Sequence, residues 1–555
     1  MEPRRLKWWG WGFDDTSLPI ESRPVLWSYL LDRLEADPNV LRRVVPLESI
    51  QVPVSLLSPR ELDEFREVAG DEGVSIADAD RVVHALGKGY KDLVRLRSGQ
   101  VRRTPDVVLY PTDEEAVRRI LDLARQRRYA VIPFGGGTGV VGGVEPSPEG
   151  GFAASLSVDL RRMHRVLEID DHSGYVTAEA GILGPELEDA LMARGLTLGH
   201  FPQSFEFSTL GGWIATRAAG GLSNLYGKIE EIVVGLRLVT PTRTLEIPPL
   251  PGMSHGPDLK ELVLGSEGIL GIITQATLRV QPRPRVRQFA SRLFRSFAAG
   301  LTALRAMARD ASLPDMAYLG DEEETRFAAA NAGIDPRPGA VSEAPLGLRL
   351  ISLRGYSLES GSLLLMGFEG SPSRVSHRRS RALDHAAPAA DLGASPAERW
   401  FAERFRLPYL RDSLLDHGIL VDTVETAAPW SRLQTVYEAG RAALQAALGS
   451  AGEPGLVLCH VSHAYRDGAS LYFTFMGRQR EGDELVQWEG IKVAVTKAFL
   501  GAGGALSHHH GIGADHSPFL GQVIGEDGLF VLRALKRSLD PEGIMNPGKL
   551  FTGIR

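Results

Sequence analysis

Three consecutive histidines, His508, His509 and His510, have the residue type and spacing for proton transfer, because imidazole titrates near neutral pH. In an extended strand, His508 and His510 would share one face and His509 would lie on the other, unless a turn gathers them. A metal site is the alternative for such a run. Only Asp515 and His516 offer further ligands close by, and a metal site ordinarily needs ligands at defined spacing. The run therefore predicts acid–base chemistry and no metal.

A glycine-rich loop from Pro133 to Gly143 follows a strand-like run and has the spacing Gly-x-Gly-x-x-Gly at positions 137, 139 and 142. In a dinucleotide-binding Rossmann fold these glycines open a helix, whose N-terminus faces the pyrophosphate. Here they run into VEPSPEGG at 144–151, which cannot form the first turns of a long helix. We therefore reject the Rossmann interpretation, although Asp159 lies about 20 residues on. A nest of backbone N–H groups around a pyrophosphate remains, with a glycine-rich turn without ligand as the alternative.

The composition bounds the class of protein. The chain has 555 residues, 43% of them hydrophobic, so it can bury large cores and we expect two or three domains. Its 62 basic and 69 acidic residues give a net charge of -7 without a polybasic block, which argues against nucleic-acid binding. The single cysteine, Cys459, fits a reducing compartment. No apolar run of about 18 residues and no secretory leader is visible, so we expect a soluble, cytoplasmic protein.

Short β-branched runs must position the glycine loop, and they predict an α+β or α/β region. A helical stretch, Thr112–Gln126, separates the first two of these strand-like runs, Val107–Tyr110, Ala130–Pro133, Ala154–Val158 and Val166–Ile169. Two Pro/Ala/Gly-rich segments, Asn331–Pro345 and Ala386–Pro396, predict surface insertions or disordered loops. We divide the chain into a helical segment at 1–98, the α+β region at 99–285, a separate domain at 286–500 and a C-terminal segment at 501–555.

Several further motifs surround the loop in order along the chain: Arg103–Glu115, Gly181–Leu187, Gly211–Thr216, Gly265–Thr274 and Asn546–Lys549. Together with the glycine loop they resemble the vanillyl-alcohol-oxidase type flavoproteins. The resemblance implies an α+β, two-subdomain FAD-binding fold at 99–285 with a separate α/β cap domain at 286–500, and a C-terminal segment that returns to the FAD domain. Covalent attachment in that family uses a His or Cys near the loop. None lies between Val131 and Pro146, so we expect non-covalent FAD.

The same resemblance implies which residues bind FAD. They are small residues, or residues beside the loop, that let the backbone approach the cofactor: Pro133, Gly135, Gly136, Gly137, Thr138, Gly139, Ser204, Ser208, Thr209, Gly211, Gly212, Thr216, Glu267, Gly268 and Ile273.

The likeness sharpens in six stretches, Trp9–Phe13, Gly199–Trp213, Asn224–Glu231, Glu425–Trp430, Tyr465–Phe473 and Leu506–Gly513. These are similar to the alkylglycerone-phosphate synthase family, whose members make the ether bond of ether lipids. The resemblance implies exchange of the acyl group of acyl-dihydroxyacetone phosphate for a long-chain fatty alcohol without net redox change. It also implies peripheral membrane contact and a homodimer as further expectations. The peroxisomal tripeptide of eukaryotic members is absent at 552–555, which favours a bacterial cytoplasmic enzyme.

Two further residues gain roles from this resemblance. Tyr472 is implied as an acid–base partner of the histidines, although in its strand-like setting a core tyrosine is the default. Arg411 is implied as the phosphate clamp, a role that suits a planar guanidinium. The alternative for Arg411 is an ordinary salt bridge to Asp412 or Asp416.

One position departs from the family pattern. Tyr318 stands where the family normally carries an arginine near the flavin, which puts synthase activity in doubt. The competing function is an FAD-linked dehydrogenase or oxidase of a D-2-hydroxy acid. A flavin- or lipid-binding protein without catalysis is a third interpretation, and the joint presence of the histidines, Tyr472 and Arg411 disfavours it.

Overall fold

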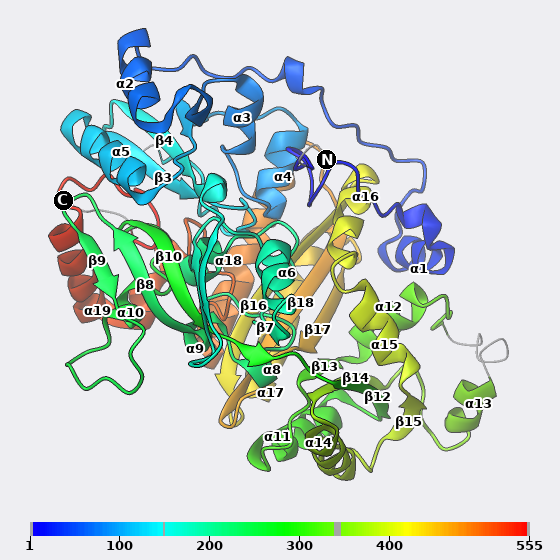
Figure 1. Cartoon of the computed structure of the whole chain (residues 1–555). Helices are drawn as coiled ribbons and strands as arrows, with labels where there is room; N and C mark the ends of the chain where they lie inside the picture. Colours follow the sequence, from blue (N-terminus) through cyan, green and yellow to red (C-terminus); the bar gives the residue numbers. More distant parts are fainter. Residues whose placement is uncertain (1–3, 148–149, 338–345, 552–555) are drawn as a thin grey trace.

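A computed structural model describes residues 4–147, 150–337 and 346–551. The first sheet, shown in blue and cyan in Figure 1, has the strand order β1-β2-β4-β3, and β2 and β3 run parallel to β4. Its strands are β1 (Val74–Ser75), β2 (Val107–Leu109), β3 (Tyr129–Phe134) and β4 (Ala154–Asp159). Helix α5 (Glu114–Arg127) connects β2 to β3 and begins at Asp113, whose side chain accepts a hydrogen bond from the N–H of Ala116.

A second, antiparallel sheet has the order β5-β6-β10-β8-β9 and shares one hydrophobic core with the first. Its strands are β5 (Val166–Asp170), β6 (Tyr175–Glu179), β8 (Val233–Val239), β9 (Thr244–Ile247) and β10 (Ile272–Arg279). A small pair joins β7 (Leu196–Thr197) to β11 (Gln281–Pro282). The helices of this region are α6 (Gly184–Met192), α7 (Leu210–Thr216), α8 (Ser223–Tyr226), α9 (Ile229–Ile232) and α10 (Leu259–Val263).

A third, seven-stranded antiparallel sheet has the order β15-β12-β14-β13-β17-β18-β16. Its strands are β12 (Val286–Phe294), β13 (Met316–Gly320), β14 (Ser362–Gly370), β15 (Ala390–Gly393), β16 (Ile419–Pro429), β17 (Leu456–Val461) and β18 (Gly468–Arg478). Helices α11 (Phe297–Arg309) and α14 (Pro372–His385) pack at the β12–β14 end, while α17 (Leu433–Leu448) packs at the β16–β18 end, together with α18 (Glu484–Ala502). The remaining helices here are α12 (Glu322–Asn331), α13 (Leu346–Ser352), α15 (Ser395–Glu403) and α16 (Leu410–Asp416).

The two ends of the chain tie the sheets together. The N-terminal region contains α1 (Pro24–Leu34), α2 (Pro59–Ala69), α3 (Asp78–Val83) and α4 (Tyr90–Arg97). Its Trp11 and Phe13 pack edge-on against Phe207. The C-terminal α19 (Ser517–Leu539) is kinked at Gly525, and the chain then returns to β3, where Val131 bridges Met545. The termini therefore stabilise the walls around the glycine loop.

The strands and the helix predicted before Pro284 are present within a residue or two of the expected ends. No helix follows the glycine loop in its described part, so the rejection of the Rossmann fold is confirmed. The expectation of a loop at Ala386–Pro396 is wrong, because these residues form β15 and the start of α15. In the other segment, positions 338–345 lie outside the described residues. The domain boundaries stay predictions.

Lys536 is fully buried and joins the C-terminal return to the loop before β10. Its ammonium donates to the carbonyl oxygens of Ile269 and Met545, each at 2.6 Å, and to the carboxylate of Asp540. Asp540 also accepts the N–H groups of Ile544 and Met545. A buried charge pair of this kind is costly to break, because the surviving partner stays in a low-dielectric interior.

We predict that Lys536→Met lowers the free energy of unfolding by about 3–5 kcal/mol, since it leaves the Asp540 carboxylate buried without its counter-ion. Urea unfolding measures the change. Lys497→Met, on the exposed face of α18, is the control and should stay within about 0.5 kcal/mol of wild type. Equal midpoints for the two variants would contradict the assigned role of Lys536.

Candidate functional site

A cavity of about 480 Å³ lies between the glycine loop and the seven-stranded sheet. Such a volume falls within the usual range for a small-molecule site. Every residue that the sequence predicts for FAD, for phosphate or for catalysis lines this cavity, with the exception of His508. The structure thus brings together side chains from Pro133 to His510, which are nearly 400 positions apart at the extremes.

The glycine loop presents bare backbone to the cavity. A side chain on Gly135 or Gly136 would clash with Thr209 or with the carbonyl of Phe207, so only glycine fits between the loop and its support. A Cβ on Gly139 would meet nothing within 4 Å, although this residue lines the cavity. Gly137 has a φ of +63°, and its Cβ would clash with the ring of Phe134. A close approach of backbone to a large cofactor is therefore possible, as the fit of FAD requires.

Asp159 supports the start of the loop through His84 and is not free to bind a ribose. Its carboxylate accepts hydrogen bonds from Arg161 and lies 2.9 Å from the Nε2 of His84. Burial raises the pKa of Asp159, but the charges of Arg161 and His84 outweigh it and lower that pKa to about 2. The His84 ring in turn packs 4.1 Å from the ring of Phe134, at the start of the loop.

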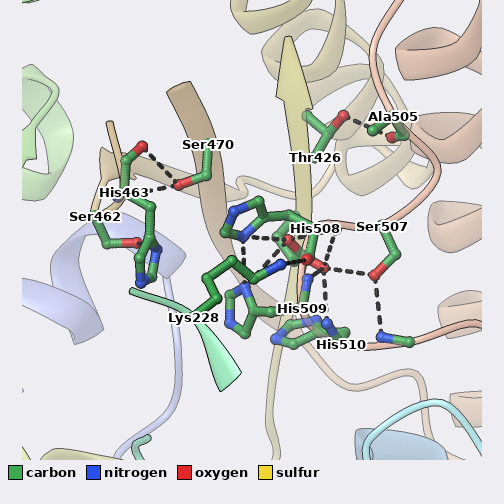
Figure 2. Close-up of polar contacts among 12 residues, drawn as sticks. Lys228, Thr426, Ser462, His463, Ser470, Ala505, Ser507, His508, His509 and His510 are labelled. Carbon is green, nitrogen blue, oxygen red and sulfur yellow. Dashed lines mark hydrogen bonds and ion pairs between the residues drawn. The ribbon is translucent and has the colours of Figure 1, made fainter. Parts of the chain in front are cut away.

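The histidine run is wrapped around one buried carboxylate. Glu425, on β16, accepts hydrogen bonds from the N–H groups of His508, His509 and His510 at 2.8–3.0 Å and from the hydroxyl of Ser507 at 2.7 Å. Figure 2 shows the three rings gathered beside Lys228, whose ammonium donates to the carbonyl of His508. The backbone therefore turns at the run, and the extended alternative, with alternating faces, does not occur.

A second carboxylate holds the end of the same segment. Glu267 accepts the N–H groups of Ile512 at 2.6 Å and Gly513 at 2.7 Å. Gly511 has a φ of +88°, and a Cβ there would lie 2.8 Å from the Glu267 carboxylate. Burial raises the pKa of Glu267 to about 7, against the two backbone donors. Glu267, which the sequence predicts as an FAD-binding residue, thus also fixes the segment that carries the histidines, which forms neither helix nor strand.

The three histidines have different surroundings. The Nε2 of His508 lies 2.6 Å from the Tyr465 hydroxyl, and its Nδ1 lies 3.0 Å from the Nδ1 of His509. His508 therefore backs His509 and does not itself line the cavity, and its catalytic role stays a prediction. Burial lowers the pKa of His508 well below its usual value and that of His510 to about 3, so both rings are neutral at neutral pH.

Glu425, His508 and His509 also meet the distance requirement for a metal site, since one ligand atom from each lies within 4.8 Å of the others. Their atoms are already engaged, however. Both Glu425 oxygens accept backbone N–H groups, and the two Nδ1 atoms face each other. Charge and hydrogen bonding favour proton transfer over metal binding here: burial raises the pKa of Glu425, but His509 and its neighbours outweigh this and lower it well below its usual range.

Tyr472 lies on β18 directly opposite Glu425 of β16 and His460 of β17. Its ring stacks on those of His460 and His509, with centroids 4.9 and 5.9 Å apart. Burial raises the pKa of Tyr472 to about 12, although a hydrogen bond to Thr423 acts the other way. The phenol is therefore protonated at neutral pH and can donate a proton into the cavity.

Arg411, in the first turn of α16, has no salt bridge to either expected carboxylate. Asp412 accepts from the ammonium of Lys7 and the N–H of Trp11, while Asp416 pairs with Arg97. The buried Nε and Nη2 of Arg411 have no hydrogen-bond partner among the described residues. Burial lowers the pKa of Arg411, which reflects the cost of holding this cation without a counter-ion. A bound anion would accept hydrogen bonds from the free Nε and Nη2.

Tyr318, which the sequence analysis predicts at the place of the family arginine, lines the cavity. Its hydroxyl donates to Glu324 at 2.6 Å and lies 2.8 Å from the Nδ1 of His460, on which the ring stacks. Trp400 packs on the other side of the ring at 4.8 Å. Tyr318 thus links the cavity wall to Glu324 and His460 through hydrogen bonds and supplies no cation.

Sequence reasoning missed several residues of this site: Trp400, Arg404, Glu425, His460, His463 and Tyr465. Glu425 carried a usable signal, because a carboxylate inside a β-branched, buried strand needs several donors. Tyr465 opens one of the stretches that resemble the family but gained no role from it, and the other four carried no signal that distinguishes them from ordinary core residues.

Comparisons with known proteins agree with this geometry. A family model described as "FAD binding domain" matches residues 105–246, and one described as "FAD linked oxidases, C-terminal domain" matches residues 283–550. A solved structure of p-cresol methylhydroxylase, 15% identical, shares the fold with a TM-score of 0.65 and covers 88% of this chain and 96% of its own. The α+β FAD-binding fold is thus confirmed.

Nearer relatives share both sequence and fold. The alkyldihydroxyacetonephosphate synthase of Trypanosoma brucei brucei is 34% identical over 98% of this chain and 92% of its own length. That of Dictyostelium discoideum is 38% identical over 86% of this chain and 78% of its own. A solved structure of an alkyldihydroxyacetonephosphate synthase has a TM-score of 0.83 and 33% identity, covering 98% of both chains. With FAD as its cofactor, the chain belongs to the alkyldihydroxyacetonephosphate synthase family.

Proposed function

We propose that this protein is an FAD-dependent alkyldihydroxyacetonephosphate synthase of ether lipid biosynthesis. Its substrates are acyl-dihydroxyacetone phosphate and a long-chain fatty alcohol. The observation that carries the proposal is the unpaired guanidinium of Arg411, which lies in the same cavity as Tyr472 and His510. A cavity that joins an anion site, a proton donor and a neutral base fits a phosphorylated ketone substrate.

The exchange is balanced without an external oxidant. The bond between the acyl oxygen and the carbon next to the ketone breaks, and the oxygen leaves with the electron pair as a fatty acid carboxylate. The oxygen of the alcohol forms the new bond to that carbon and releases its proton. A proton on the same carbon leaves and returns during the exchange.

FAD would be held by the bare backbone of Gly135–Gly139 and by the small residues around α7. When bound, it supplies a conjugated ring that can accept an electron pair from the reacting centre and return it. The contribution of the chain is to orient the ring against Tyr472, His509 and His510, which line the same cavity.

The residues of the chain have separate tasks. Arg411 binds the phosphate of the substrate with its free N–H groups. His510, neutral at neutral pH, accepts the proton from the carbon next to the ketone. Tyr472, protonated at the same pH, donates a hydrogen bond to the acyl oxygen as it leaves and so stabilises the carboxylate. Glu425 and His508 orient His509, which lies beside Tyr472. His509 passes protons between His510 and Tyr472.

Peripheral membrane contact, a homodimer and a cytoplasmic location are further proposals. The long-chain substrates support membrane contact, because such chains partition into lipid. No helix in the described part of the chain is long and apolar enough to cross a membrane.

We predict that the FAD-loaded protein converts acyl-dihydroxyacetone phosphate and labelled hexadecanol into alkyl product without oxygen. Tyr472→Phe should lower this exchange by about 100-fold or more, because it removes a positioned proton donor. It should leave FAD bound, since Tyr472 lies on β18 and not in the glycine loop. Product formation is measured by the label and FAD content by absorbance.

Exchange at the wild-type rate in Tyr472→Phe would contradict its role. Reduction of the FAD by D-lactate, without exchange, would contradict the synthase function and favour the D-2-hydroxy acid dehydrogenase. Relatives named D-lactate dehydrogenase and glycolate oxidase subunit match at 25–27% identity and make this the outcome to exclude.

A second prediction concerns the cofactor. Gly139→Val should fold yet purify without FAD, because its side chain would point into open cavity space that the cofactor needs and not into the protein. Gly490→Val, on the exposed face of α18, is the control and should retain FAD. Yellow Gly139→Val protein with a wild-type flavin content would contradict this placement. Release of all flavin on denaturation of the wild type is expected for non-covalent binding.

A further inference from the structure

A second unpaired arginine lines the cavity. Arg404 follows α15, and its guanidinium carbon lies 3.8 Å from the ring centroid of Phe401 and 4.2 Å from that of Phe405. It donates one hydrogen bond to the carbonyl of Phe401. Among the described residues no carboxylate forms an ion pair with Arg404, in contrast to its neighbour Arg287, which pairs with Glu369 at 2.6 Å.

This cation is held in a costly place. Burial lowers the pKa of Arg404 to about 10, the charge of Arg287 adds to the effect, and Glu369 opposes it. Arg404 therefore keeps its charge at neutral pH. Contact with aromatic faces offsets part of the burial cost. Only Nη1 of Arg404 has an acceptor among the described residues, so Nε and Nη2 can donate to an anion.

The two unpaired arginines have different surroundings. The charges that act most on Arg411 are polar neighbours, Asp412, Asp422 and Tyr472, which suits the phosphate of a small polar headgroup. Arg404 instead lies among phenylalanine rings, which suits an anion at the end of an apolar chain. The proposed exchange has two such anions, the phosphate throughout and the carboxylate once the acyl oxygen has left.

We propose that Arg404 binds the carboxylate of the fatty acid that leaves during the exchange, with the start of the alkyl chain along Phe405, which also lines the cavity. This inference rests on the proposed function. A planar guanidinium can donate two parallel hydrogen bonds to the two carboxylate oxygens, so it stabilises the charge of the leaving group as that charge develops. Each arginine then recognises one of the two anionic groups of the reaction.

The test measures binding without turnover. Calorimetry on FAD-loaded protein compares decanoate with dihydroxyacetone phosphate in the variants Arg404→Met and Arg411→Met. Arg404→Met should weaken decanoate binding by at least about tenfold and change dihydroxyacetone phosphate binding by less than about twofold, and Arg411→Met should do the reverse. Decanoate affinity that is unchanged in Arg404→Met would overturn the proposal.

Three controls sharpen the result. Arg399→Met removes a positive charge from the exposed face of α15 and should change neither affinity. Methyl decanoate has no charge, so its affinity should be the same with and without Arg404, and an equal loss for the ester would show apolar packing in place of carboxylate binding. If Arg404→Met loses FAD, Arg404→Lys keeps a cation over the rings, and a loss of about threefold or more for decanoate alone would support the proposal.

The same data separate this inference from the proposed function. Protein that binds decanoate through Arg404 but forms no alkyl product would refute synthase activity and leave the carboxylate site in place. Protein that forms alkyl product, with decanoate binding independent of Arg404, would refute the carboxylate site and leave the synthase in place.

Discussion

Two buried carboxylates hold the segment on which the candidate site depends. Residues 507–513 form neither helix nor strand, so their buried N–H groups need other acceptors. Glu425 accepts hydrogen bonds from the N–H groups of the three histidines, and Glu267 accepts them from the N–H groups of Ile512 and Gly513. Glu425 belongs to the seven-stranded sheet and Glu267 to the loop before β10. The histidines are therefore fixed where these two parts of the molecule meet.

The charges around the cavity fit a reaction that moves protons and keeps anions in place. Burial holds His510 neutral and Tyr472 protonated at the same pH, so a base and an acid coexist a few ångströms apart. Arg404 and Arg411 contribute cations without counter-ions from the chain. Burying such cations without counter-ions lowers the stability of the folded protein, and a bound anionic ligand supplies the missing partners. The Lys536 pair supplies rigidity at a distance from the chemistry, whereas Trp11, packed against Phe207, lines the cavity beside Arg411.

Local signals in the sequence were enough to predict the glycine loop, the strands around it and the absence of a helix after it. Proline and glycine restrict or free the backbone only within a few residues, so their effect can be read locally. The resemblance to a family supplied the residues of the cavity. Neither could show that Glu425 lies against His508–His510, since this pairing spans more than 80 positions and depends on the register of β16 and β18. The sequence also could not show that Arg411 has no salt bridge, because Asp412 and Asp416 pair with Lys7 and Arg97 of the distant N-terminal segment. Strand β15 was missed, since pairing with β12 overrides its alanine-rich composition.

The most direct test of this account is the exchange rate and FAD content of Glu425→Gln. The amide keeps the size of the side chain but turns one acceptor into a donor that faces backbone N–H groups, so the histidine turn loses its anchor. We expect exchange to fall by about 100-fold or more while FAD stays bound, with Glu489→Gln on the exposed face of α18 unchanged in both. Wild-type exchange by Glu425→Gln would contradict the claim that this carboxylate builds the site.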